Sequence, residues 1–269
     1  MPLRKPAVAG TFYPAQVQEL ESELKRCLST HPTSKEKVIG VVSPHAGYIY
    51  SGVVAGAVFS KIEIPDKLII LSPNHTGLGS PFSIMPEGEW ETPLGRAKID
   101  QPLASLFMKN CPLLEIDQEA HRREHSLEVQ IPFLQHLKKA FSFVPVTLGH
   151  IPFEDCETVG QGLAATIRKS GEEILIIASS DMNHYESQGI AEKKDQIAIQ
   201  QILKLDPKRL FDKVHQSSVS MCGIIPTTVM LIAAKELGAK KAELIKHATS
   251  GDVTGDYNSV VGYASLMIS

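Results

Sequence analysis

Short apolar runs that alternate with helical patterns constrain the fold of this 269-residue chain more than any other feature. The runs are rich in Val and Ile and occupy residues 38–43, 67–72, 141–146, 173–180, 242–248 and 259–268. They show little polar alternation, which is typical of strands covered on both faces. Segments with helical spacing fall at residues 16–28, 52–61, 101–109, 125–139, 157–169, 189–203 and 226–237. This alternation predicts an α/β fold with a largely parallel central sheet flanked by helices.

Two segments depart from the alternation. Residues 83–100, SIMPEGEWETPLGRAKID, are expected to form an extended hairpin excursion, and residues 29–37, STHPTSKEK, read as a polar linker. The chain shows no internal repeat and no interdomain linker, and its 43% hydrophobic content can bury a sizeable core. We therefore expect one domain that spans residues 1–269.

The charge and the hydropathy of the chain exclude two classes of partner. A formal net charge of −3 provides no field that would hold a polyanion, so we expect no nucleic acid. No apolar stretch approaches the roughly 18 residues that a membrane span needs, and the N-terminus MPLRKPAVAGTFYP has no continuous apolar segment. A cytoplasmic protein without a membrane partner is expected.

Three of the predicted strands end in the same chemistry. The run VVSPHAGY reaches His45, LIILSPNH reaches His75, and IIASSDMNH reaches Asp181 and His184. In a parallel sheet these exits lie along one edge, and ligand sites of open α/β folds lie outside the carboxyl ends of the strands. A lone histidine at such a position is usually a hydrogen-bonded surface residue. The recurrence predicts that these side chains converge on a site.

A second cluster of polar residues occurs in EAHRREHSLEVQIPFLQHL, residues 119–137. His121, His125 and Glu128 have the spacing i, i+4, i+7, which places them on one stripe if the helix extends back that far. We expect His121 to belong to a helix start, where Glu124 would complement the helix dipole. For His125 and Glu128, a role in the site and a structural role both stay open.

The four cysteines are scattered, and no CxxC pair occurs. Cys222, in VSMCGIIPTTVM, precedes Gly223 and a helix expected near Pro226, and a nearby helix N-terminus favours a thiolate. The other three cysteines are expected in the core, as small apolar residues. Cys222 is therefore the one cysteine predicted to take part in a site.

Several specific motifs occur along almost the whole chain, in the order PAVAGTFYP, SPHAGYIYSG, SPNHTG, ETPLGR, EHSLEVQIPFLQ, SSDMNHY and MCGIIPT. On these motifs the chain resembles the Memo family, which is also called AmmeMemoRadiSam system protein B. The resemblance implies a single α/β domain similar to the class III extradiol ring-cleaving dioxygenases, which hold non-haem iron. One fold hosts many chemistries, so ring cleavage does not follow from this likeness.

The resemblance also implies roles for individual residues. His45 and His75 match the two metal-binding histidines, and Cys222 falls where the dioxygenases place a glutamate ligand. Two histidines and a carboxylate form the facial triad of Fe(II), whereas a thiolate makes the site softer and admits copper or zinc as well. We expect Fe(II) first, with Cu or Zn as alternatives.

Three further residues are implied as catalytic. Asp181 and His184 match residues that line the same pocket, and His184 corresponds to the acid/base histidine of the dioxygenases. His125 matches their second pocket histidine. In this interpretation His184 transfers protons near neutral pH and Asp181 orients it.

Three functions fit these expectations. The leading one is a metal-binding redox enzyme that acts with O2 or a reduced oxygen species. The second is a regulatory module that keeps a dioxygenase-like pocket for a peptide or an anion, and the third, which lacks an obvious bridging carboxylate, is a metal-dependent hydrolase. The ligand is an unknown small molecule or peptide, and the family name implies radical-SAM and AMMECR1-like partner proteins.

Overall fold

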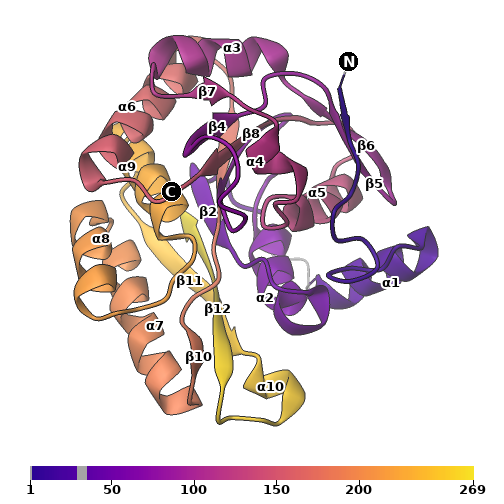
Figure 1. Ribbon diagram of the computed structural model, residues 1–269, viewed down its shortest axis with the longest axis vertical. Helices are drawn as coiled ribbons and strands as arrows, with labels where there is room; N and C mark the ends of the chain where they lie inside the picture. The colour runs from indigo at the N-terminus through magenta and orange to yellow at the C-terminus, as the bar shows by residue number, and fades with distance from the viewer. Residues whose placement is uncertain (1, 29–34) are drawn as a thin grey trace.

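The computed structural model describes residues 2–28 and 35–269 and shows an α/β fold (Figure 1). Residues 29–34, most of the expected polar linker, lie outside the described residues. The strands are β1 Leu3–Arg4, β2 Gly40–Ser43, β3 Lys67–Pro73, β4 Phe82–Ile84, β5 Glu89–Thr92, β6 Gly95–Ile99, β7 Glu115–Ile116, β8 Ser142–Leu148, β9 Ile174–Ser179, β10 His184–Glu186, β11 Ala242–Thr249 and β12 Val260–Ile268.

The helices are α1 Val17–Cys27, α2 Tyr48–Lys61, α3 Gln101–Asn110, α4 Glu119–Arg122, α5 Ile131–Leu137, α6 Phe153–Ser170, α7 Gln188–Leu203, α8 Pro207–Gln216, α9 Ile224–Glu236 and α10 Gly251–Thr254, and a 3-10 turn covers Glu128–Gln130. Helix α8 is absent from the sequence prediction. Its start follows the usual rules, because the Asp206 side chain accepts the amide of Arg209 and Pro207 is the first helical residue.

The strands form one mixed sheet with the order β1-β5-β6-β8-β3-β9-β2-β12-β10, and β11 pairs with β12. Its centre is parallel, because β6, β8, β3, β9 and β2 run in the same direction. Strand β12 is antiparallel to β2, and β5 and β6 form the expected hairpin excursion. The prediction of an α/β fold with a parallel central sheet is confirmed.

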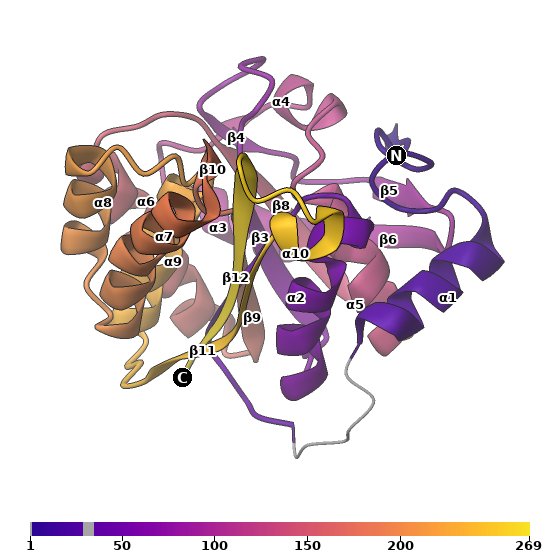
Figure 2. The ribbon, with the colours of Figure 1, turned by 90° about the horizontal axis from the view of Figure 1, so that it is seen from below.

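Helices cover both faces of this sheet (Figure 2). Helices α3, α6, α7, α8 and α9 pack on one face, and α1, α2 and α5 pack on the other. Strand β3 is apolar throughout because both of its faces are buried. Ile69 and Leu71 belong to the core on the side of α3 and α6–α9, and Leu68 and Ile70 to the core on the side of α1, α2 and α5. A central strand that is buried on both faces leaves only its ends for polar chemistry.

No helix within residues 2–28 and 35–269 is both long enough and apolar enough to cross a membrane.

Candidate metal centre

The carboxyl ends of three parallel strands meet at one edge of the sheet. Ser43, the last residue of β2, lies opposite Ser179, the last residue of β9, and β3 pairs with β9 on its other side. His45, His75 and Asp181 each follow one of these strands by two residues. The sheet register therefore brings together side chains that are distant in the sequence, as the strand exits predicted.

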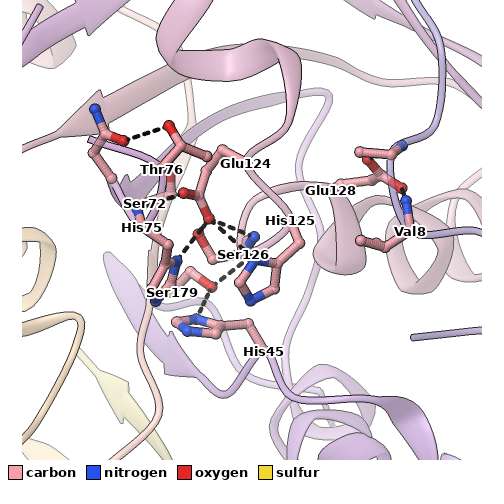
Figure 3. Close-up of polar contacts among 12 residues, drawn as sticks. Val8, His45, Ser72, His75, Thr76, Glu124, His125, Ser126, Glu128 and Ser179 are labelled. Atoms are coloured by element: carbon pink, nitrogen blue, oxygen red, sulfur yellow. Dashed lines mark hydrogen bonds and ion pairs between the residues drawn. The ribbon is translucent and has the colours of Figure 1, made fainter. Parts of the chain in front are cut away.

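Three imidazole rings cluster at this edge (Figure 3). Ring centroids are 5.1 Å apart for His45 and His75, 5.5 Å for His45 and His125, and 4.7 Å for His75 and His125. One possible ligand atom from each ring lies within 4.8 Å of the other two. Within the part of the chain that the structure describes, this is the group that can hold a metal ion.

Hydrogen bonds fix the protonation of the His45 ring. The Ser179 hydroxyl donates its hydrogen to the Ser126 carbonyl at 2.7 Å and accepts from Gln130 Nε2 at 2.9 Å. Nδ1 of His45 lies 2.9 Å from the same hydroxyl oxygen, so it must be the donor. Nε2 of His45 therefore carries no hydrogen. Burial, and then the neighbouring His75, lower the pKa of His45 well below its usual value and keep the ring neutral.

A buried carboxylate holds the His75 ring. Nδ1 of His75 donates to Glu124 Oε1 at 2.8 Å, and the backbone amide of His75 donates to Oε2 at 2.6 Å (Figure 3). Burial alone would raise the pKa of Glu124, but hydrogen bonds from His75 and Ser126 bring it down to about 2. Burial alone would lower the pKa of His75, but the hydrogen bond and charge of Glu124 raise it. In the neutral ring the hydrogen stays on Nδ1 and Nε2 is bare, which is the usual arrangement behind a metal-binding histidine.

His125 closes the cluster. Its ring packs against Phe12 at a centroid distance of 4.6 Å, and its Nδ1 lies 3.5 Å from Glu124 Oε1. Burial lowers the pKa of His125 to about 4, so the ring is neutral near pH 7. Neutral imidazoles suit iron, copper and zinc alike. The donors at this edge therefore fit a divalent transition metal.

Cys222 contacts the same site from the start of α9. Its Sγ lies 3.1 Å from Nε2 of His45, and the Asp181 amide donates to Sγ at 3.3 Å. Burial, followed by the charge of Asp181, raises the pKa of the Cys222 thiol well above its usual value. The thiol therefore donates to the bare Nε2 of His45. A coordinated cation would reverse this preference, because a metal deprotonates a bound thiol.

Asp181 and His184 also border the cluster. Asp181 Oδ1 accepts the backbone amide of His45 at 2.7 Å, and Oδ2 lies 4.0 Å from Nε2 of His45. Burial raises the pKa of Asp181 to about 7. Nδ1 of His184 donates to the Ser220 carbonyl at 2.9 Å, and burial lowers the pKa of this ring. Ser220, and not Asp181 as expected, orients His184.

The condition for a helical stripe of His121, His125 and Glu128 is not met, because no continuous helix joins them. Helix α4 ends at Arg122, and regular helical structure resumes at Glu128, so the intervening chain is free to turn His125 into the cluster. His121 is fully buried, and its Nδ1 forms a hydrogen bond with Thr147 at 3.1 Å. Tertiary contacts override the local helical spacing here.

The two glutamates of this segment have different roles: Glu128 takes the structural one of its two open roles, and Glu124 takes part in the site. Glu128 pairs with Arg4 at 2.6 Å and accepts the backbone amide of Ala7, which fixes the N-terminal segment. It also accepts the backbone amide of Val8 (Figure 3). Glu124, expected only to complement a helix dipole, orients His75. No local signal could have found this role, because the histidine that Glu124 orients lies 49 positions away in the sequence.

A Glu124→Gln variant is expected to lose the part of the pH dependence of its unfolding free energy that comes from Glu124. The pKa of Glu124 in the folded chain, about 2, lies below the unfolded value of about 4.3, so its ionised form stabilises the fold above pH 4.3 and the gain is lost as pH falls through 2. The shift corresponds to roughly 3 kcal/mol. Urea unfolding of both proteins, from neutral pH downward, should show their stability difference shrinking below about pH 4. A pH-independent difference would contradict this assignment.

Comparisons with known proteins show the family of the chain. The model of the Memo-like protein family matches residues 4–267. A MEMO1 family protein of Methanosarcina mazei is 44% identical over 269 residues, covering 100% of both chains. Those of Methanocaldococcus jannaschii and Pyrobaculum arsenaticum are 43% and 42% identical, each covering 99% of both chains. On the full-length match of sequence and family model, this chain belongs to the Memo-like protein family.

Proposed function

We propose that this protein binds one transition metal ion, Fe(II) in preference to Cu or Zn, and uses it in redox chemistry with O2 or a reduced oxygen species. The observation that carries the proposal is the pair of Nε2 atoms on His45 and His75. Nδ1–H of His45 donates to Ser179 at 2.9 Å, and Nδ1–H of His75 donates to Glu124 at 2.8 Å. Neither Nε2 atom then carries a hydrogen of its own neutral ring, so both can serve as ligand atoms at one edge of the sheet.

The third ligand is Cys222 or His125. Cys222 contacts His45 directly, whereas His125 completes the group of three imidazoles. Two histidines with one thiolate make a softer site than three histidines do, so this choice decides how strongly the site favours iron over copper. When bound, the metal supplies Lewis acidity and an accessible one-electron couple.

The surrounding residues supply proton chemistry. His184 is half-buried and keeps its hydrogen on Nδ1, so its Nε2 can accept a proton. Burial brings the pKa of Asp181 to about 7, which allows this carboxyl group to hold or release a proton near neutral pH. A group whose pKa lies near the operating pH suits proton-coupled redox chemistry, and Asp181 meets this condition.

Cobalt(II) titration under anaerobic conditions distinguishes the two third ligands. If Cys222 binds, the wild type should show a sulfur-to-cobalt charge-transfer band, and Cys222→Ser should lose it while His125→Ala retains it. If His125 binds, the band should be absent from the wild type, and His125→Ala should weaken cobalt affinity at least about tenfold, the lower range for loss of a metal-site partner. No cobalt uptake by any of the three proteins would overturn the proposed function.

A further inference from the structure

Two segments that border the site are held together by one buried amide. Residues 180–186 follow β9, and residues 218–223 lead into α9. Between them lies Asn183, whose side chain is fully buried. Neither metal binding nor proton transfer, as described above, assigns a role to Asn183.

Asn183 determines where Ser220 lies. Its Oδ1 accepts both the backbone amide and the hydroxyl of Ser220, each at 3.1 Å. Ser220 itself is exposed, so packing does not fix its position. A buried carboxamide that loses its partners costs about 1–3 kcal/mol, so these two bonds are strongly favoured. The position of Ser220 therefore follows from that of Asn183.

Ser220 in turn determines the state of His184. The hydroxyl oxygen of Ser220 accepts the backbone amide of His184 at 2.8 Å, and its carbonyl accepts Nδ1–H at 2.9 Å. A carbonyl can only accept, so Nδ1 must carry the hydrogen when the ring is neutral. Nε2 of His184 is then left without one.

Asn183 is itself held in place by hydrogen bonds to residues outside the segment 218–223. The backbone amide of Asn183 donates to Asp195 Oδ1 at 2.8 Å, and Asp195 is fully buried in α7. Nε2 of His247, on β11, lies 2.8 Å from the other carboxylate oxygen of Asp195. Nδ2 of Asn183 donates to Glu186. Helix α7 and strand β11 thus fix the position of Asn183, which in turn holds Ser220.

We propose that Asn183 is a positioning residue that, through Ser220, holds His184 as the Nδ1–H tautomer. The role of this tautomer in proton transfer rests on the proposed function, whereas the tautomer itself does not. Without Asn183, Ser220 loses two of its hydrogen bonds, and the carbonyl that accepts Nδ1–H of His184 is no longer fixed in place. The neutral His184 ring can then exchange tautomers. Asn183 acts without touching substrate or metal.

The test is nitrogen-15 NMR of the imidazole rings in metal-free protein, at a pH well above the usual histidine pKa of about 6.5. Wild type is expected to show Nδ1–H for both His184 and His45. In Asn183→Ala, and more mildly in Ser220→Ala, His184 should become a mixture of tautomers while His45 is unchanged. Glu186→Gln removes the charge at the other contact of Asn183 and should leave His184 as it is.

Two results would overturn the proposal. In the first, His184 stays entirely Nδ1–H in both Asn183→Ala and Ser220→Ala. In the second, His45 becomes mixed together with His184, which would mean that the substitutions loosen the whole site. The spectra are taken without metal, so this test remains valid even if the protein binds no metal. In the same way, an unchanged His184 tautomer would not argue against metal binding.

Discussion

Replacing Arg4 by methionine is expected to lower the free energy of unfolding by about 3–5 kcal/mol, the usual cost of removing one partner of a buried ion pair. Arg4 is 6% exposed and its guanidinium lies 2.6 Å from the fully buried Glu128. The same guanidinium donates to the carbonyls of His121 and Glu124 and stacks 3.9 Å above the Trp90 ring. Methionine keeps the volume but leaves the Glu128 charge without its cation.

The matched control is Lys5→Met, because Lys5 pairs with Glu91 at the same distance of 2.6 Å but is 69% exposed. Exposed pairs contribute about 0–1 kcal/mol, so this variant should unfold almost like the wild type in urea. A double variant, Arg4→Met with Glu128→Gln, should recover part of the loss, since it also removes the unpaired charge. Equal effects of Arg4→Met and Lys5→Met would contradict this account of the N-terminal segment.

His75→Ala is expected to abolish metal binding. The variant removes one of the two available Nε2 atoms and also takes the imidazole hydrogen bond from Glu124. A buried carboxylate that loses a donor is costly to the site, so the remaining ligands should not compensate. Anaerobic titration with Fe(II) measures the result directly, as the uptake per chain.

His215→Ala serves as the control for this titration. His215 is an exposed histidine on α8 whose Nδ1 contacts the Phe211 carbonyl within the same helix. Its loss removes an imidazole without touching the cluster, so uptake should equal that of the wild type. Unchanged Fe(II) uptake in His75→Ala would contradict the assignment of His75 as a ligand.

The sequence predicted the fold well because its signals are local. Strands β3 and β9 are almost entirely apolar, because a strand that is covered on both faces buries all of its side chains. From the parallel arrangement alone it followed that His45, His75 and Asp181 would meet at one edge. The resemblance to the Memo family implied that Cys222 lies beside them, and its Sγ lies 3.1 Å from Nε2 of His45.

The parts that sequence reasoning missed depend on contacts between distant segments. Glu124 binds a histidine 49 positions away, and nothing in its own neighbourhood distinguishes it from a helix-start glutamate. The chain from 123 to 127 has helical spacing but is not helical, because the burial of Glu124 and the packing of His125 outweigh a weak local preference. Ser179 reads as the end of a strand, and only the fold shows that it orients His45.

The most direct test of the metal site is elemental analysis of the wild-type protein purified anaerobically, before and after incubation with Fe(II) and removal of the excess. The account predicts one metal ion per chain, iron in the incubated sample, held at the His45 and His75 edge. No metal in the purified protein, together with no uptake of Fe(II), Cu or Zn, would contradict it.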